Sequence, residues 1–164
     1  MPSLSLPSFC QENIRVIKNT PIDPGCTAPR ELDGKIRIVF AGWLDSGRGI
    51  STLIKLAKIM PHIELLVAGE GDNEIVKAIT SITNCTYYGF LDHDEVLALT
   101  KNADFVFAHY SPHRIINRYA APNKLAESLA VGRPVLINEE ALVSELVTRF
   151  NCGIVTKYGD VEIL

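Results

Sequence analysis

The residues best suited to chemistry lie in one glycine-rich segment, Gly42-Trp43-Leu44-Asp45-Ser46-Gly47-Arg48-Gly49. Glycines let the backbone approach a ligand closely, and apolar residues at helical spacing begin at Ile50. The first turn of a helix has free N–H groups that bind anions, and Arg48 adds a permanent charge. The segment therefore indicates a phosphate site. A turn with a solvated arginine also fits it, whereas a P-loop fits poorly because its Lys-Ser/Thr pair is replaced by Arg-Gly.

A second candidate lies between Asn117 and Val135. A helix here would place Leu125, Ala126, Leu129 and Ala130 on one packing face and the polar side chains on the other. Asn123 and Lys124 would then lie in the first turn, where backbone donors can hold a diphosphate. Glu127 would lie one turn deeper and could accept hydrogen bonds from ribose hydroxyls. An ion pair between Lys124 and Glu127 on a solvated face is the alternative.

A third glycine pair, Gly69-Glu70-Gly71, is weaker evidence for a ligand. A dinucleotide fingerprint requires another glycine where Glu74 stands, so a tight turn is the favoured interpretation.

Strands and helices alternate around these segments. Apolar, β-branched runs predict strands at 36–41, 63–68, 85–88, 104–108, 134–137 and 153–155. Helical spacing and caps predict helices at about 50–60, 72–80, 92–101, 122–131 and 140–150, with a long loop at 109–121. This pattern predicts an α/β domain, a doubly wound Rossmann-like parallel sheet of about six strands. Ligands of such sheets bind at the carboxyl ends of the strands, where the loops 42–49, 69–72, 89–91 and 109–122 follow.

Length and composition restrict the function further. The chain has 164 residues, enough for one domain, which we expect at 35–164 after an irregular tail and linker at 1–34 that contains a strand-like run at 14–17. A net charge of −3 gives no basic field for nucleic acid. The four scattered cysteines are expected to be reduced thiols of a cytosolic protein. We expect no signal peptide, no transmembrane segment and no metal.

The motifs in this order resemble the C-terminal domain of group 1 (family 4) glycosyltransferases, which have the GT-B fold. The resemblance covers about residues 13–164. It is carried by the following motifs: Ile17–Asp23 as the linker strand, Phe40-Ala41-Gly42 with Arg48-Gly49, Leu66–Gly71, Tyr88–Leu91, Ala103-Asp104, and Pro122–Val135 as the family's PxKLxEAMAxGxPV.

The resemblance implies a nucleotide-sugar donor (UDP-, GDP- or ADP-linked) as substrate, without a cofactor. Glu127 matches the second glutamate of the family's E-x(7)-E motif, which holds the ribose, and Gly89 and Phe90 match residues that contact the base. The donor pyrophosphate is expected at Gly42, Arg48, Asn123 and Lys124. Tyr119 stands where the first motif glutamate contacts the donor sugar, and His109 and His113 flank the same loop. Trp43 replaces a common arginine.

The same resemblance implies a partner domain. The family's catalytic histidine lies in an N-terminal acceptor domain that this sequence lacks, so we expect no catalytic residue in this chain and no transfer by it alone. The expected function is sugar transfer to a saccharide or lipid-linked acceptor in polysaccharide, capsule or cell-envelope glycan synthesis. We expect a cytoplasmic location, at the inner membrane face if the other half contacts lipid. A degenerate nucleotide-binding or regulatory module and a GT-B sugar-nucleotide epimerase are the alternatives.

Overall fold

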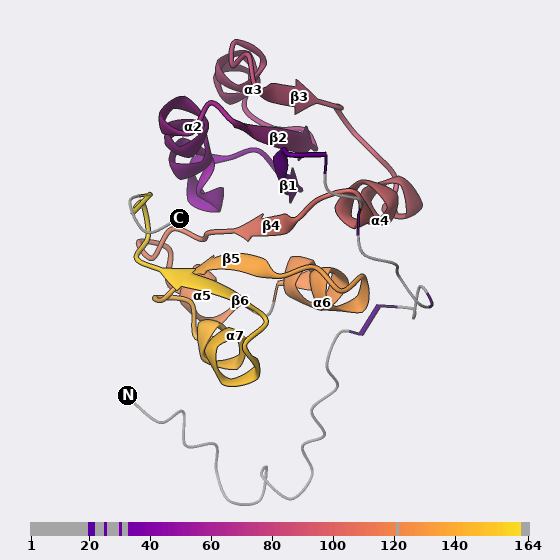
Figure 1. The fold of residues 1–164 in the computed structure, drawn as a ribbon. Helices are drawn as coiled ribbons and strands as arrows, with labels where there is room; N and C mark the ends of the chain where they lie inside the picture. Colours follow the sequence, from indigo (N-terminus) through magenta and orange to yellow (C-terminus); the bar gives the residue numbers. More distant parts are fainter. Residues whose placement is uncertain (1–19, 22–24, 26–29, 31–32, 121, 162–164) are drawn as a thin grey trace, which may run out of the picture.

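The computed structural model describes residues 20–21, 25, 30, 33–120 and 122–161 (Figure 1). Its strands form one six-stranded parallel sheet in the order β3-β2-β1-β4-β5-β6. The strands are β1 (Ile36–Ala41), β2 (Ile63–Ala68), β3 (Cys85–Tyr87), β4 (Phe105–Ala108), β5 (Val135–Asn138) and β6 (Gly153–Thr156). This order confirms the predicted doubly wound fold and reverses direction between β1 and β4. The strand-like run predicted at 14–17 lies outside the described residues.

Helices cover both faces of the sheet. They are η1 (Ser46–Arg48), α2 (Ile50–Ile59), α3 (Asn73–Thr80), α4 (His93–Lys101), α5 (Ile115–Tyr119), α6 (Asn123–Ala130) and α7 (Ser144–Phe150). One face lies against α2 and α3, and the other lies against α4, α6 and α7 (Figure 1). In the described part of the chain, no helix has both the length and the apolar character needed to cross a membrane.

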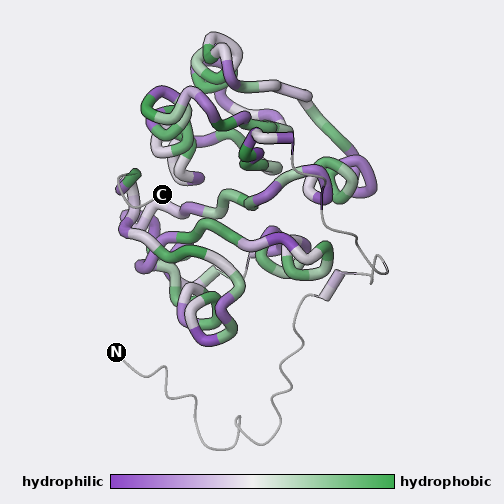
Figure 2. Tube along the Cα trace, in the orientation of Figure 1, coloured by the Kyte–Doolittle hydropathy of each residue, from purple (hydrophilic) through white to green (hydrophobic). Residues whose placement is uncertain are grey.

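The core follows from strands that are apolar on both sides. Phe40 and Phe107 face the α2 side and are fully buried, whereas Val39 and Val106 face the α4 side. Burying a side chain of this size stabilises the fold by about 1.5–3 kcal/mol. Hydrophobic segments accordingly run along the strands, while the helices alternate hydrophobic and hydrophilic residues (Figure 2). The sheet is therefore a rigid support for the loops at its carboxyl edge.

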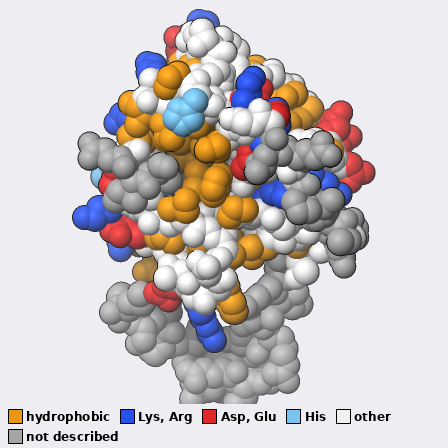
Figure 3. Space-filling model, viewed as in Figure 1, with side chains coloured by type: hydrophobic (Ala, Val, Ile, Leu, Met, Phe, Trp, Pro, Cys, Tyr) orange, Lys and Arg blue, Asp and Glu red, His pale blue; other side chains and the backbone are white. Residues whose placement is uncertain are grey.

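The surface carries charges of both signs. On the face viewed in Figure 3, Lys and Arg side chains are interspersed with Asp and Glu around the rim, and hydrophobic side chains gather near the centre. The described residues on that face form no continuous basic surface of the kind that binds nucleic acid.

Local caps fix the ends of two helices as predicted. Asp92 and Glu95 form a capping box at the start of α4, each side chain accepting a hydrogen bond from the other residue's backbone N–H at 2.9 Å. Asp72 caps α3 in the same manner, accepting from the N–H of Glu74 at 2.8 Å. These caps place the loops before α3 and α4 at the carboxyl edge of the sheet.

The segment 109–121, predicted as a loop, contains the short helix α5. The buried side chain of Asn117 donates hydrogen bonds to the carbonyl oxygens of Gly47, at 3.2 Å, and Ser111, at 3.0 Å. These contacts fix α5 against η1. The prediction was wrong because a contact between residues 70 positions apart leaves no periodicity in the local sequence.

The last helix is also shorter than predicted. Helix α7 begins at Ser144, not near residue 140, because the preceding turn is held by other parts of the chain. The N–H of Leu142 donates to the carbonyl of Arg118 at 2.8 Å, and the carboxylate of Glu140 accepts from Asn138 and from the N–H of Tyr158. These bonds hold residues 140–142 to α5 and to the segment after β6.

Candidate functional site

A cavity of about 610 Å³ lies at the carboxyl edge of the sheet, where the strand order reverses. The loops after β1, β2, β3 and β4 and the first turns of α6 surround it. Its lining residues are Ala41, Gly42, Trp43, Arg48, Ala68, Gly69, Glu70, Phe90, Leu91, His93, Val96, Tyr110, Ala120, Pro122, Asn123, Lys124 and Glu127. Both the position and the volume are typical of a small-molecule site in this kind of sheet.

Two cations share the aromatic wall of this cavity. The Nζ of Lys124 lies 3.7 Å from the ring centroid of Phe40 and 5.7 Å from that of Tyr110. The guanidinium carbon of Arg48 lies 5.4 Å from the same Tyr110 centroid. Phe40 and Tyr110 are both buried, so they cannot turn away from the cations. The arrangement concentrates positive charge at the start of α6, where the helix dipole adds to it.

Burial and the neighbouring cation both disfavour a charge on Lys124. Loss of hydration is the larger cause and the charge of Arg48 the next, and together they lower the pKa of Lys124 to about 7. The carboxylates of Glu127 and Asp45 act in the opposite direction. Burial also raises the pKa of Tyr110 to about 12, so its hydroxyl is neutral. An entering anion would relieve the repulsion between the two basic groups.

Glu127 supplies a carboxylate one helical turn beyond Lys124. Its side chain is 21% exposed and lies on the cavity wall. His93, the first residue of α4, places its Nδ1 4.0 Å from a carboxylate oxygen of Glu127. The exposed ring of Phe90 lies on the same side of the cavity, before α4. This wall therefore offers a hydrogen-bond acceptor beside apolar surface.

Close backbone contacts hold the first two loops in place. The N–H of Gly42 donates to the carbonyl of Ala68 at 3.0 Å, and the N–H of Gly69 donates to the carbonyl of Gly89 at 2.7 Å. A Cβ atom at Gly69 would overlap the carbonyl oxygen of Gly42, and the φ of Gly69 is +130°. Only glycine fits here. The Gly69–Gly71 motif is thus explained by contact between loops, and not by a dinucleotide fingerprint.

The floor beneath Tyr110 is a network of buried polar groups. The buried Asn138 accepts a hydrogen bond from the N–H of Tyr110 at 2.7 Å and donates to Glu140 at 2.8 Å. His109, which flanks the predicted donor loop, lies in this floor, 1% exposed and stacked on Phe107 with ring centroids 4.6 Å apart. Alternation continuing beyond β4 turns His109 into the core, under Gly49.

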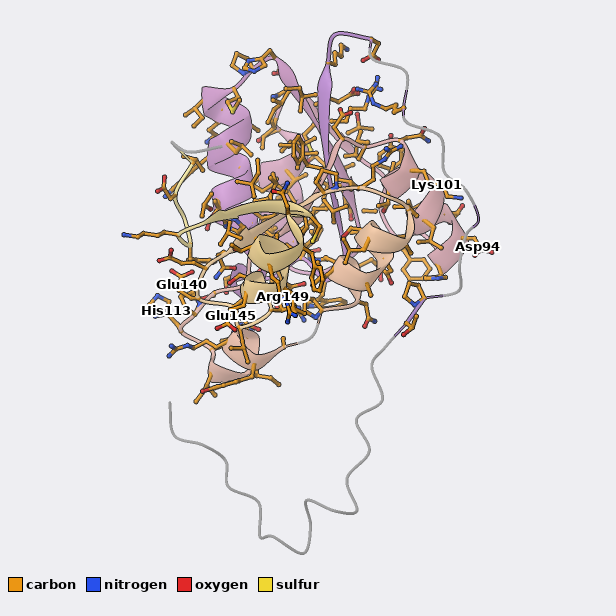
Figure 4. All side chains as sticks on the ribbon, turned by 60° about the horizontal axis from the view of Figure 1, so that its bottom comes forward. Asp94, Lys101, His113, Glu140, Glu145 and Arg149 are labelled. Atoms are coloured by element: carbon orange, nitrogen blue, oxygen red, sulfur yellow. The ribbon has the colours of Figure 1, made fainter. Side chains whose placement is uncertain are left out.

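The predicted site residues divide into two groups. One group lines the single cavity described above: Gly42, Arg48, Phe90, Asn123, Lys124 and Glu127. Gly89 directly precedes Phe90. The second group, Tyr119 and His113, is exposed and does not line the cavity. Figure 4 places His113 on the side of α5 and α7, opposite Asp94 and Lys101 of α4.

Tyr110 and His93 line the cavity and were not among the predicted site residues. Tyr110 follows β4 by two positions, and position at the carboxyl end of a central strand is a feature that could have singled it out. His93 is the first residue of α4. Its approach to Glu127 joins α4 to α6, and nothing in either segment alone indicates that contact.

The chain is thus a Rossmann-like domain with a cavity at the carboxyl edge of its sheet. The family model "Glycosyl transferases group 1" matches residues 28–164, and the chain belongs to this family. No curated protein sequence matches the chain significantly.

Three solved structures share the fold. The S. aureus protein TarM, solved with UDP and two saccharide ligands, has a TM-score of 0.69 at 16% identity over 92% of this chain and 31% of its own. The Anabaena protein HepE, solved with UDP and glucose, has a TM-score of 0.59 at 19% identity, covering 79% and 36%. The C-terminal domain of LpcC from Francisella tularensis has a TM-score of 0.62 at 15% identity, over 78% of this chain and 70% of its own. The chain thus spans about a third of the first two.

Proposed function

We propose that this chain is the donor-binding domain of a glycosyltransferase and that its cavity holds the nucleoside diphosphate of a nucleotide-sugar. The observation that carries the proposal is that Arg48 and Lys124 both lie against Tyr110, while Glu127 follows Lys124 by one turn of α6. Two adjacent cations suit two adjacent phosphates, and a carboxylate suits ribose hydroxyls as an acceptor. The exposed ring of Phe90 offers an apolar surface to a base.

The chemical contribution of this domain is to stabilise the leaving group. Negative charge develops on the nucleoside diphosphate as the sugar departs, and Arg48, Lys124 and the N–H groups in the first turn of α6 would meet it. Because these groups can neutralise a diphosphate, we propose that binding needs no divalent metal and will be unchanged by EDTA. Tyr119 and His113 stay predicted contacts of the donor sugar.

The acceptor and a catalytic base would come from a second domain. Transfer requires both to be held within reach of the sugar carbon. We propose a saccharide or lipid-linked acceptor, in the synthesis of polysaccharide, capsule or cell-envelope glycan, at the cytoplasmic side of the membrane. UDP in the TarM and HepE structures makes UDP-sugars the first donors to test.

The test is calorimetric titration of the chain with UDP, GDP and ADP and with the matching nucleosides at pH 6.5. At least one diphosphate should bind more than 100-fold more tightly than its nucleoside. Arg48→Ala should weaken that binding by about 10- to 150-fold, the loss of a hydrogen bond to a charged group. Arg149→Ala, on α7 beside Phe150, is the control and should change nothing. Equal affinity for nucleoside and diphosphate would refute the proposal.

A transfer assay separates the two alternative functions. Turnover with a saccharide acceptor, once an acceptor domain is supplied, supports the transferase. Sugar-nucleotide products formed without any acceptor would indicate an epimerase, and binding without turnover under all conditions would indicate a regulatory module.

A further inference from the structure

The amine of Lys124 contacts aromatic rings instead of polar groups. The described residues give its Nζ no hydrogen bond and no ion pair; it lies against the faces of Phe40 and Tyr110. Gly42 lies nearby, since a Cβ atom added to it would be 3.3 Å from the same nitrogen. The amine thus lies at the cavity wall, against groups that replace little of its hydration.

The charges around this amine oppose each other. Arg48 reaches it from η1 and repels an ammonium, while Asp45, before η1, and Glu127, on the same helix α6, attract one. Tyr110, at the end of β4, is neutral. The ring faces offset part of the lost hydration through cation–π contacts. The balance gives Lys124 a pKa of about 7, so that both the neutral and the charged amine are populated near neutral pH.

We propose that Lys124 takes up a proton from solvent when a diphosphate enters the cavity and releases it when the nucleotide leaves. The proposal rests on the proposed function, since the ligand is the diphosphate of the donor. No covalent bond changes: a neutral amine, a proton and the phosphate anion become an ammonium–phosphate ion pair. The charge of the entering anion attracts an ammonium, and this attraction offsets both the lost hydration and the repulsion from Arg48 that lower the pKa of the amine.

Two consequences distinguish this coupling from an ordinary salt bridge. Above neutral pH, diphosphate affinity falls by up to about tenfold for each pH unit, because each unit makes the proton tenfold scarcer. A nucleoside carries no charge to stabilise the ammonium, so its affinity stays constant over the same range. The site thereby discriminates by ligand charge, and the discrimination weakens as pH rises.

The test is calorimetry at pH 8.5 with the best binder among UDP, GDP and ADP. The terminal phosphate is fully ionised there, since its second pKa is about 6, and contributes no proton. Repeating the titration in buffers of different ionisation enthalpy gives the number of protons taken up per ligand. We expect about one proton per ligand for the native chain at this pH, because an amine with a pKa near 7 is almost fully neutral before binding.

Variants assign the proton to its residue. Lys124→Arg keeps a permanent cation and should bind with no proton uptake at pH 8.5; Lys124→Gln should also take up none and should bind more weakly. Lys58→Gln, an exposed lysine of α2, should keep the uptake of the native chain. Binding of a diphosphate without proton uptake would overturn this inference alone. Failure of all three diphosphates to bind would overturn the proposed function with it.

Discussion

Substituting Glu127 by glutamine tests the ribose contact with the least disturbance of the fold. The side chain is 21% exposed, and the backbone carbonyl of Glu127, which accepts from the N–H of Val131, is unaffected. Loss of a charge-assisted bond to the ribose should cost about 1.5–3 kcal/mol, equivalent to a diphosphate affinity about 10- to 150-fold weaker. The same loss should appear with the nucleoside, because the ribose is common to both ligands.

The assay must separate this contact from an indirect effect on Lys124. The Glu127 carboxylate supports the charge on Lys124, so its removal lowers the pKa of that amine further. Titrations at pH 6, where the native amine is mainly protonated, keep this effect small. Glu145→Gln on α7, away from the cavity (Figure 4), is the matched control. Unchanged affinity for both nucleoside and diphosphate in a folded Glu127→Gln chain would refute the ribose assignment.

Three further predictions concern stability, each measured by urea unfolding of the chain without ligand. Gly69→Ala should lower the free energy of unfolding by about 2–5 kcal/mol, because the new Cβ would overlap the Gly42 carbonyl and the φ of Gly69 is positive. Gly89→Ala should lower it by only about 1–2 kcal/mol, since Gly89 has a φ of +68° but open space around it. Equal losses in the two variants would contradict this reasoning. Burial lowers the pKa of His109 from 6.5 to about 4, so the unfolded chain binds the proton first and stability should fall by about 3 kcal/mol between pH 6.5 and pH 4. In His109→Gln, stability should fall less between pH 6.5 and pH 4. If the pH dependence of stability is unaltered in this variant, groups other than His109 cause it. Lys124→Met should stabilise the chain most below pH 7, where the native protein must hold a charged Lys124. The gain in stability should shrink progressively towards pH 10.5, the ordinary pKa of lysine. A gain that does not change with pH would contradict this prediction.

Local sequence predicted the sheet well because each strand is an apolar run that must be buried on both faces, as Val39 and Phe40 are. It also predicted the α4 cap, since Asp92 and Glu95 lie within one turn of each other. It failed at α5, where Asn117 is held by Gly47 from a distant segment. Contacts of this kind depend on the finished fold and have no local periodicity.

The candidate site shows the same division. Arg48, Lys124 and Glu127 could be identified because each lies in a motif with a helix N-terminus or a helical turn. Tyr110 could not be identified, since its role depends on contacts with Arg48 and Lys124, which belong to different segments of the chain. His109 flanks the same loop but lies in the core, because one position along the chain decides whether a side chain faces the cavity or the core.

The most direct test of the account is to map a nucleoside diphosphate onto the chain by amide chemical-shift changes. UDP, GDP and ADP would each be titrated into the isotope-labelled protein at pH 6.5. We predict that the best binder shifts the amides of Gly42, Arg48 and Asn123–Glu127 and leaves those of α7 unchanged. Saturable shifts confined to other surfaces, or none with any of the three diphosphates, would contradict the assignment of this cavity to a nucleotide-sugar donor.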